Sequence, residues 1–325
     1  MARPLADEWA SSLLWANLRG VDSHGVLRVP RYVELLKTKA INPRPEMQLA
    51  RRTAALVVLE ADRAPGAIAM SRAMNEAIAC AHATGIGWCA ARNITHAGAV
   101  GYFALQAARA GMAGMVMTAS GPLMAYHGSR VPGVSTNPLA IAFPAAKRAP
   151  YVVDMSTSTV AMGKLMSARD ARKDVPVGWG VDAQGRDTTD SAKIATLLPM
   201  SGAKGSGLSF MIECLCSLTI RNPIIASALE SGADWDNPFL NGAAVAIDLA
   251  AFGDADLIRQ EADRLGDAIL SLPTAPGVDR ILLPGERGDS MLRERERSGI
   301  PLPLGTWNRL LATARGLGVA APEIV

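Results

Sequence analysis

The chain has 325 residues, of which 49% are hydrophobic and 19% charged, so it can bury a large core without disulfides or metals. Its net charge of +3 comes from dispersed basic residues, which argues against a nucleic-acid-binding protein. Only Arg293, Arg295 and Arg297 are clustered, and glutamates alternate with them, which is typical of a solvated helix face. The composition indicates an α/β enzyme rather than a coiled coil or a disordered chain.

The cysteines at 80, 89, 214 and 216 form neither a CxxC pair nor a zinc-type spacing with histidine. Free, buried thiols are therefore expected, as in a reducing cytoplasm. The first residues lack the apolar core of a signal peptide, and no uninterrupted apolar run is long enough to span a membrane. The sequence thus predicts a cytoplasmic protein without a membrane segment or a metal site.

Hydrophobic periodicity predicts alternating helices and strands along the chain. The expected helices cover residues 6–18, 32–39, 67–83, 99–110, a segment starting near Thr159, 205–219, 254–270, 287–298 and 304–316. The expected strands cover 54–59, 86–91, 113–118, 139–143, 151–154, 243–249 and 280–283. Residues 172–194 are polar and rich in glycine, so they are expected to form a long functional loop.

The two consecutive strands within 139–154 interrupt the alternation, so we expect a mixed α/β sheet. No GxGxxG follows an early strand, which argues against a classical Rossmann domain. The expected organisation is an N-terminal helical and substrate segment (1–90), a cofactor-binding α/β domain (91–225) and a C-terminal segment (226–325). This last segment should pack back on the first, so that both chain ends form one helical layer.

The segment from Arg19 to Tyr32 brings three chemically useful side chains close together in the sequence. His24 stands between Ser23 and Gly25, Arg28 follows four residues later, and Tyr32 four residues after that. A titratable imidazole, a fixed cation and a phenol can together bind a carboxylate and move a proton.

The other histidines differ in their surroundings. His96 lies in a Gly-rich loop between an expected strand and helix, which suits a general acid/base, although a capping or core role is the commoner fate of a lone histidine. His82 lies within an Ala-rich helix and is assigned to structure, whereas His127 stays open. Histidines without clustered carboxylates argue against a catalytic metal, and the absence of GxSxG argues against a serine hydrolase.

Two loops could contact a phosphate or another polar ligand. Gly202–Gly207 contains Lys204 and opens a helix, so its amides and charge could hold a phosphate, but a flexible loop with a surface lysine is equally consistent. Residues 154–159 follow a strand with one acid and several hydroxyls. That position is common for ligands in α/β sheets, and it also fits a helix N-cap.

In combination these segments resemble the non-Rossmann malate/L-lactate dehydrogenase family. Relatives include ureidoglycolate and sulfolactate dehydrogenases, 2,3-diketo-L-gulonate reductase and Δ1-piperideine-2-carboxylate reductase. The matching segments are 19–25 with Arg28, Pro30 and Tyr32, then 93–102, 136–140, 153–158, Pro176 to Trp179, 188–190, 204–207 and 283–286.

The resemblance implies an oxidoreductase that uses NAD or NADP to interconvert a 2-hydroxy acid and a 2-keto acid. It also implies a homodimer with its sites near the subunit interface. His96 matches the proton donor and acceptor, and His24 a second active-site histidine. Ser23, Arg28 and Tyr32 would hold the substrate carboxylate. The positions that match cofactor contacts are Ser120, Asp154, Met155, Ser156, Lys204, Gly205, Pro284, Gly285 and Glu286.

Three alternatives stay open at this point. One is a cyclic imino-acid reductase, and another is a catalytically impaired relative that binds metabolites. The third, which rests on the 202–207 loop alone, is an α/β nucleotide-binding protein of unrelated chemistry. The chain begins later than is usual for the family, and a shortened N-terminal unit is expected to reduce stability or dimerisation. Retention of His24, His96 and Arg28 favours an active enzyme, because a pure binding protein needs no proton-transfer group.

Overall fold

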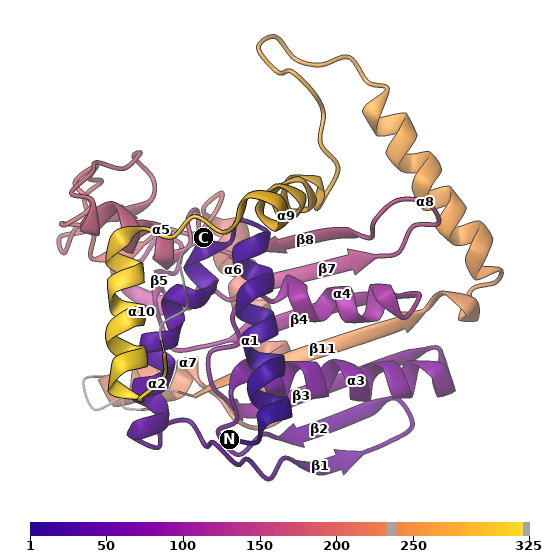
Figure 1. The fold of residues 1–325 in the computed structure, drawn as a ribbon, viewed down its shortest axis with the longest axis horizontal. Helices are drawn as coiled ribbons and strands as arrows, with labels where there is room; N and C mark the ends of the chain where they lie inside the picture. The colour runs from indigo at the N-terminus through magenta and orange to yellow at the C-terminus, as the bar shows by residue number, and fades with distance from the viewer. Residues whose placement is uncertain (233–236, 238, 321–325) are drawn as a thin grey trace.

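A seven-stranded mixed sheet runs through the centre of the molecule (Figure 1). The computed structural model describes residues 1–232, 237 and 239–320. In spatial order the strands are β1 (Gln48–Arg52), β2 (Leu56–Glu60), β3 (Ile86–Ile94), β11 (Leu240–Asp248), β4 (Met112–Ala119), β7 (Leu139–Phe143) and β8 (Tyr151–Met155). β2 and β3 are parallel, and every other neighbouring pair is antiparallel, which confirms the expected mixed sheet.

The helices gather mainly around this sheet, and the short 3₁₀ and π turns are labelled η. The helices and turns are α1 (Arg3–Leu18), η1 (Asp22–His24), η2 (Val26–Arg28), α2 (Val29–Lys37), α3 (Gly66–Thr84), α4 (Gly101–Arg109), α5 (Met162–Asp170), α6 (Ala203–Glu213), η3 (Cys214–Leu218), α7 (Ile225–Ser231), η5 (Leu249–Ala251), α8 (Ala255–Leu270), α9 (Glu286–Ser298) and α10 (Leu304–Gly316).

A second, four-stranded sheet lies beside the main body, in the order β6 (Pro132–Val134), β5 (Met124–Ala125), β10 (Thr196–Leu197) and β9 (Gly180–Val181). Its small core includes Met124, Leu165 and Leu197, so it packs against α5. The long loop expected at 172–194 contributes β9 to this sheet.

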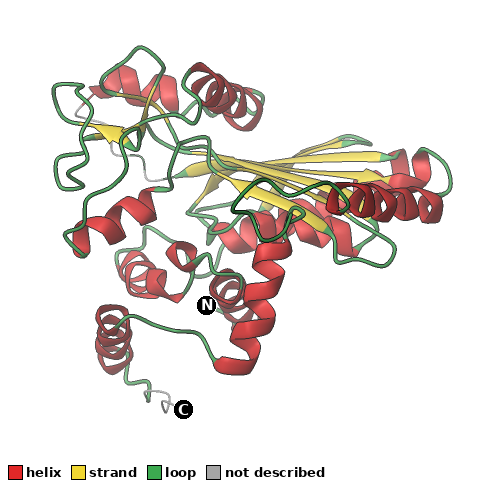
Figure 2. Cartoon of the chain, turned by 90° about the horizontal axis from the view of Figure 1, so that it is seen from above, coloured by secondary structure: helices red, strands yellow, loops and turns green. Residues whose placement is uncertain are grey.

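Small residues allow the helices to approach the main sheet closely. A Cβ added to Gly87 on β3 would lie 1.8 Å from the carbonyl oxygen of Ala77 on α3, and one added to Gly114 on β4 would lie 2.4 Å from that of Ala104 on α4. The Ala- and Gly-rich composition thus serves the packing of α3 and α4 on one face. Figure 2 shows this layer below the sheet, with another helix on the opposite side.

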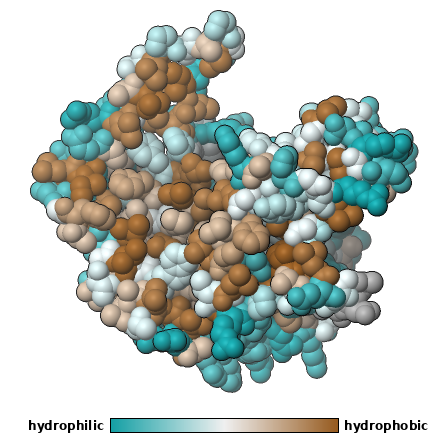
Figure 3. Space-filling model, turned by 180° about the vertical axis from the view of Figure 1, so that it is seen from behind, coloured by the Kyte–Doolittle hydropathy of each residue, from teal (hydrophilic) through white to brown (hydrophobic). Residues whose placement is uncertain are grey.

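The opposite face of the sheet is only partly covered. α6 and η3 pack over Met117, Ala119 and Ala243 near one end of the strands. Farther along, Ile86, Ile141 and Val153 are 47%, 44% and 40% exposed. Figure 3 shows apolar side chains spread over this side of the molecule.

The two chain ends meet, as expected. α1 contacts α9, and α2 contacts α10, so N-terminal and C-terminal helices form one layer (Figure 1). β1, β2 and β11 join the main sheet from the two flanking segments, and the proposed boundaries at 90 and 225 stay a prediction. Residues 321–325 of the C-terminal segment lie outside the described residues.

Several expected elements need correction. Residues 280–283 form no strand: they belong to an irregular segment in which Val152 donates its backbone N–H to the Pro284 carbonyl. The helix expected near Thr159 begins at Met162, and α6 begins at Ala203 and ends in the π-helical η3. The strand β1 was not expected, because all five of its residues are exposed and it lacks a hydrophobic pattern.

Among the described residues, no helix combines the length and the apolar character needed to cross a membrane. In the same part of the chain, no group of three or more His, Cys, Asp or Glu side chains is arranged to hold a metal ion.

Candidate active site

The predicted site residues converge on one edge of the main sheet. β3, β4 and β8 all end there, because β4 and β8 are both antiparallel to β7, and β3 and β4 are both antiparallel to β11. His96 follows β3, Ser120 follows β4, and residues 154–156 are the end of β8. The pairing of strands that are distant in sequence therefore gathers loops from three parts of the chain.

His24 and His96 lie together at this edge. Their rings are stacked, with centroids 5.5 Å apart and planes inclined by 17°. His24 comes from the turn η1, and His96 from the loop between β3 and α4. The structure thus brings together the two histidines that the sequence identified as candidates.

Tyr32 holds the second of these rings. Its hydroxyl lies 2.7 Å from Nδ1 of His96. The phenol ring is 5% exposed and packs on Trp9, with ring centroids 4.8 Å apart. Trp9 gave no signal in the sequence beyond its place in an amphipathic helix.

Ser23 and Arg28 complete the cluster. The hydroxyl of Ser23 lies 2.9 Å from Nδ1 of His24, and Arg28 donates from Nε to the Ser23 carbonyl oxygen over 2.8 Å. Among the described residues, the Arg28 guanidinium makes this one hydrogen bond, through Nε. Its two Nη groups are not used by it. A forked cation of this kind can bind a carboxylate in bidentate fashion.

Both histidines are kept neutral by their surroundings. Burial, followed by the charge of Arg28, lowers the pKa of His24 to about 4. Burial, followed by repulsion from His24 and Arg28, holds the pKa of His96 well below its usual value. Burial raises the pKa of Tyr32 to about 12, against a smaller opposing effect of Arg28. A neutral imidazole at physiological pH can accept a proton.

Both imidazoles are nevertheless partly accessible to solvent. Next to His96, Gly98 has a φ of +83°, and a Cβ added there would meet no atom within 4 Å. Open space therefore borders the backbone next to His96.

Helix α9, in the C-terminal segment, contacts the turn that carries His24. Arg295, whose side chain is 10% exposed, donates to both carboxylate oxygens of Asp22 over 2.6 and 3.1 Å. Arg19 pairs with Asp289 and donates to the Gly285 carbonyl oxygen over 3.0 Å. The expected solvated arginine face of this helix is therefore wrong for Arg295.

Asp154 lies at the end of β8 and accepts a hydrogen bond over 2.8 Å from the backbone N–H of Gly101, the first residue of α4. A carboxylate at a helix N-terminus is favourable. Desolvation nevertheless raises its pKa to about 6, against the opposing effects of that bond and of Arg19. The residue is nevertheless exposed, so a ligand can reach it from solvent.

The remaining residues predicted for the cofactor surround the same strand ends. Ser120 donates its backbone N–H to Asn137 over 3.2 Å, and Gly205 fits tightly against the Thr157 carbonyl oxygen. Glu286 accepts from the backbone N–H of Leu283 over 2.9 Å, next to the Pro284–Val152 bond on the edge of β8. Lys204 is exposed in the first turn of α6.

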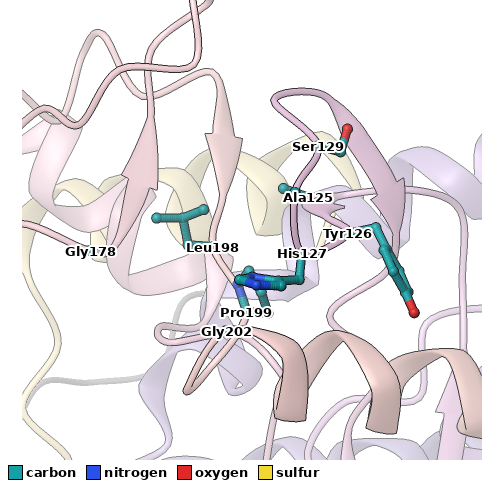
Figure 4. Close-up of a pocket in the computed structure, with 9 residues that line it drawn as sticks. Ala125, Tyr126, His127, Ser129, Gly178, Leu198, Pro199 and Gly202 are labelled. Carbon is teal, nitrogen blue, oxygen red and sulfur yellow. The ribbon is translucent and has the colours of Figure 1, made fainter.

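His127, which the sequence left open, lies elsewhere. It lines a pocket of about 290 Å³ between β5, the end of β10 and the start of α6 (Figure 4). Its neighbours there include Tyr126, Ser129, Leu198 and Gly202. The pocket does not include His24 or His96, and the imidazole of His127 is exposed.

Two neutral imidazoles beside an arginine at the ends of the strands are an arrangement that can bind a carboxylate and accept a proton. The comparisons with known proteins name the class of protein: a family model for malate/L-lactate dehydrogenase matches residues 1–311, and the chain belongs to this family. It is accordingly an oxidoreductase, and the expectation of a dehydrogenase that works with NAD or NADP is confirmed at the level of the family.

The similarity extends along nearly the whole chain. Malate dehydrogenase from Pyrococcus horikoshii is 33% identical over 95% of this chain and 88% of its own length. Ureidoglycolate dehydrogenase (NAD(+)) from Escherichia coli O157:H7 is 32% identical over 94% of this chain and 88% of its own length. The solved structure of sulfolactate dehydrogenase from Methanocaldococcus jannaschii covers 98% of this chain and 92% of its own, with a TM-score of 0.87 and 30% identity.

Proposed function

We propose that this protein interconverts a 2-hydroxy acid and the corresponding 2-keto acid, with His96 as the acid/base on the substrate oxygen. The observation that carries the proposal is the stacked pair of His24 and His96 beside Arg28. In oxidation, neutral His96 takes the hydroxyl proton, and in reduction its protonated form returns it. A positioned general base contributes typically about 10²–10⁴-fold to the rate.

The neighbouring residues have distinct roles in this proposal. Arg28 binds the substrate carboxylate through its Nη groups, since Nε is committed to the Ser23 carbonyl. Ser23 orients His24 through the contact of 2.9 Å between its hydroxyl and Nδ1. The ring of His24, which is stacked on that of His96, contacts the substrate. Together with Arg28, it also disfavours the protonated form of His96.

The cofactor would lie along the strand ends. When bound, the nicotinamide supplies or accepts the hydride, and the protein orients the two reactants. The open space beside Gly98 and the exposed carboxyl group of Asp154 at the end of β8 support this placement. The residues proposed to hold the cofactor are Ser120, Asp154, Met155, Ser156, Lys204, Gly205, Pro284, Gly285 and Glu286. The choice between NAD and NADP is part of the test, with NAD expected first because a relative's name states NAD(+).

Malate is the first substrate to test. A relative that is 33% identical is a malate dehydrogenase, and other similar proteins are named for ureidoglycolate and sulfolactate. All three are 2-hydroxy acids with a second polar group, so Arg28 would meet the feature that they share. Lactate and a cyclic imino acid complete the panel, the latter to test imino-acid reduction.

The decisive experiment follows nicotinamide absorbance with each acid and with NAD and NADP in turn, alongside calorimetry of cofactor binding. Turnover of at least one 2-hydroxy or 2-keto acid is expected. Turnover of the imino acid alone would replace the proposal with the reductase. Saturable metabolite binding without any turnover, in a folded protein, would identify a catalytically impaired relative.

We further propose a cytoplasmic homodimer. The location is supported by the four cysteines, all of them free. The dimer is supported by the open apolar face of the sheet and by α8, which extends beyond β8 with Leu257 and Leu265 58% and 63% exposed (Figure 1). Apolar surface of this extent on a sheet and a projecting helix suits a second copy of the chain.

A further inference from the structure

The hydroxyl of Tyr32 is directed at His96 rather than at open space. The phenol is 5% exposed, lies against Trp9 and belongs to the hydrophobic core. Its oxygen lies 2.7 Å from Nδ1 of His96. A substrate carboxylate would have to displace this bond to reach the hydroxyl, whereas Arg28 can offer its Nη groups without such a loss.

We propose that Tyr32 is a positioning residue for His96: by holding Nδ1, it leaves Nε2 as the ring atom that exchanges a proton with the substrate. This inference rests on the proposed function of His96. An imidazole has two chemically similar nitrogens, and the partner of one decides which is presented to a ligand. Here the partner comes from α2, which Trp9 on α1 holds in place.

The same bond serves both stages of the proton transfer. When His96 is protonated, Nδ1–H donates to the Tyr32 oxygen. When the ring is neutral and can accept a proton at Nε2, its hydrogen is on Nδ1, which still donates to the Tyr32 oxygen; the phenol keeps its own proton, because burial raises its pKa to about 12. The ring thus keeps its orientation through the cycle, and no proton needs to leave Tyr32.

The test combines Tyr32→Phe with nitrogen NMR of the imidazole of His96 and with steady-state kinetics. Tyr151→Phe is the matched control, since it removes a hydroxyl that donates over 3.0 Å to the Ala262 carbonyl at the far end of β8. We expect one dominant ring form of His96 in the wild type and in Tyr151→Phe, and a mixture of both tautomers in Tyr32→Phe. The kcat should fall by about 10-fold or more, with the KM for the acid nearly unchanged.

Each other outcome overturns the inference. A raised KM with unchanged kcat would make Tyr32 a substrate-binding residue, and an unchanged NMR signature would show that it does not hold His96. If Tyr32→Phe fails to fold, a mixture of tautomers in the wild type would still refute the inference, and one dominant form would support it. The NMR measurement needs no turnover, so it is independent of whether the proposed reaction is correct.

Discussion

The imidazole rings of His24 and His96 are stacked, with 5.5 Å between their centroids and 17° between their planes, and Arg28 acts electrostatically on both. Three positive charges in such a small space would repel one another strongly in partly desolvated surroundings. The guanidinium stays charged, so the histidines remain neutral. This arrangement provides a proton acceptor beside a fixed cation, which is what oxidation of a hydroxy acid requires.

Replacement of His96 by glutamine removes the proposed proton-transfer group and preserves polarity. The kcat should fall by about 10²–10⁴-fold, while the cofactor dissociation constant measured by calorimetry should stay nearly unchanged. His82→Gln is the control, because that side chain is 63% exposed on α3 and lies beside Asp248. A His96→Gln enzyme with wild-type kcat would remove His96 from the mechanism.

Arg28→Lys keeps the charge and loses the planar fork. We expect the KM for the acid to rise by about 10-fold, which corresponds to about 1.4 kcal/mol, because a bidentate contact is replaced by a point charge. Arg31→Lys provides a neighbouring control, since Arg31 is exposed and pairs with Glu34. Equal KM values for Arg28→Lys and wild type would show that the carboxylate binds elsewhere.

The histidine pair also makes stability depend on pH. The pKa of His24 is about 4 in the folded protein and 6.5 as its ordinary value, so the unfolded chain binds the proton more readily. The stability that neutral His24 contributes is therefore fully present above pH 6.5, and it is lost as the pH decreases from 6.5 toward about 4. Asp154 has the opposite effect on stability. Its pKa is raised to about 6 in the folded protein, so acidification favours the folded state at this group.

His24→Gln separates these effects, since Asp154 is present in both proteins. Between about pH 7.5 and about pH 5, the wild type should lose about 1–2 kcal/mol more unfolding free energy than the variant. Urea unfolding at the two pH values measures this difference. A variant that loses as much stability as the wild type would contradict the depressed pKa of His24.

The bond between Arg295 and Asp22 connects the end of the chain to the turn of His24. Arg295→Met should cost about 1–3 kcal/mol of stability, less than a fully buried pair because Asp22 is 47% exposed. It should also lower kcat, because the turn that carries Ser23 and His24 loses its anchor. Arg293→Met on the same helix is the control, and an equal effect of both variants on kcat would disprove this role.

The sequence predicted the components of this site better than their connections. His24, Arg28 and Tyr32 were recognisable from their spacing, and His96 from its place between a strand and a helix. The bond between Tyr32 and His96 was not predictable, because it depends on how α2 packs beside the end of β3. The role of Arg295 was missed for the same reason, since local charge alternation does not reveal a distant carboxylate.

The fold shows the same limit. Elements with clear periodicity, such as α3, β4 and α8, were predicted to within a few residues. The strand expected at 280–283 was wrong because an apolar run specifies burial and not pairing. Leu283 is buried, yet within the described residues the segment meets β8 through one backbone hydrogen bond, from Val152 to Pro284. β1 was missed because its five exposed residues carry no hydrophobic pattern, and it forms a strand by pairing with β2.

The open face of the sheet provides a direct test of the proposed dimer. Ile141 on β7 lies opposite Val153 on β8, and both project from the face that α6 leaves uncovered. A lysine at Ile141 would place a charge within the proposed contact, where a second copy would have to desolvate it. We expect the mass from light scattering to change from that of a dimer for the wild type to that of a monomer.

Val177→Lys is the matched control, because Val177 is 64% exposed on the loop after α5, away from the sheet face. Circular dichroism must show that both variants are folded. A monomeric wild type would refute the dimer itself, and a dimeric Ile141→Lys protein would place the contact on another surface. If monomers of Ile141→Lys retain kcat, the cluster of His24, His96 and Arg28 works within one chain, whereas loss of turnover on dissociation would mean that the second copy supports the site.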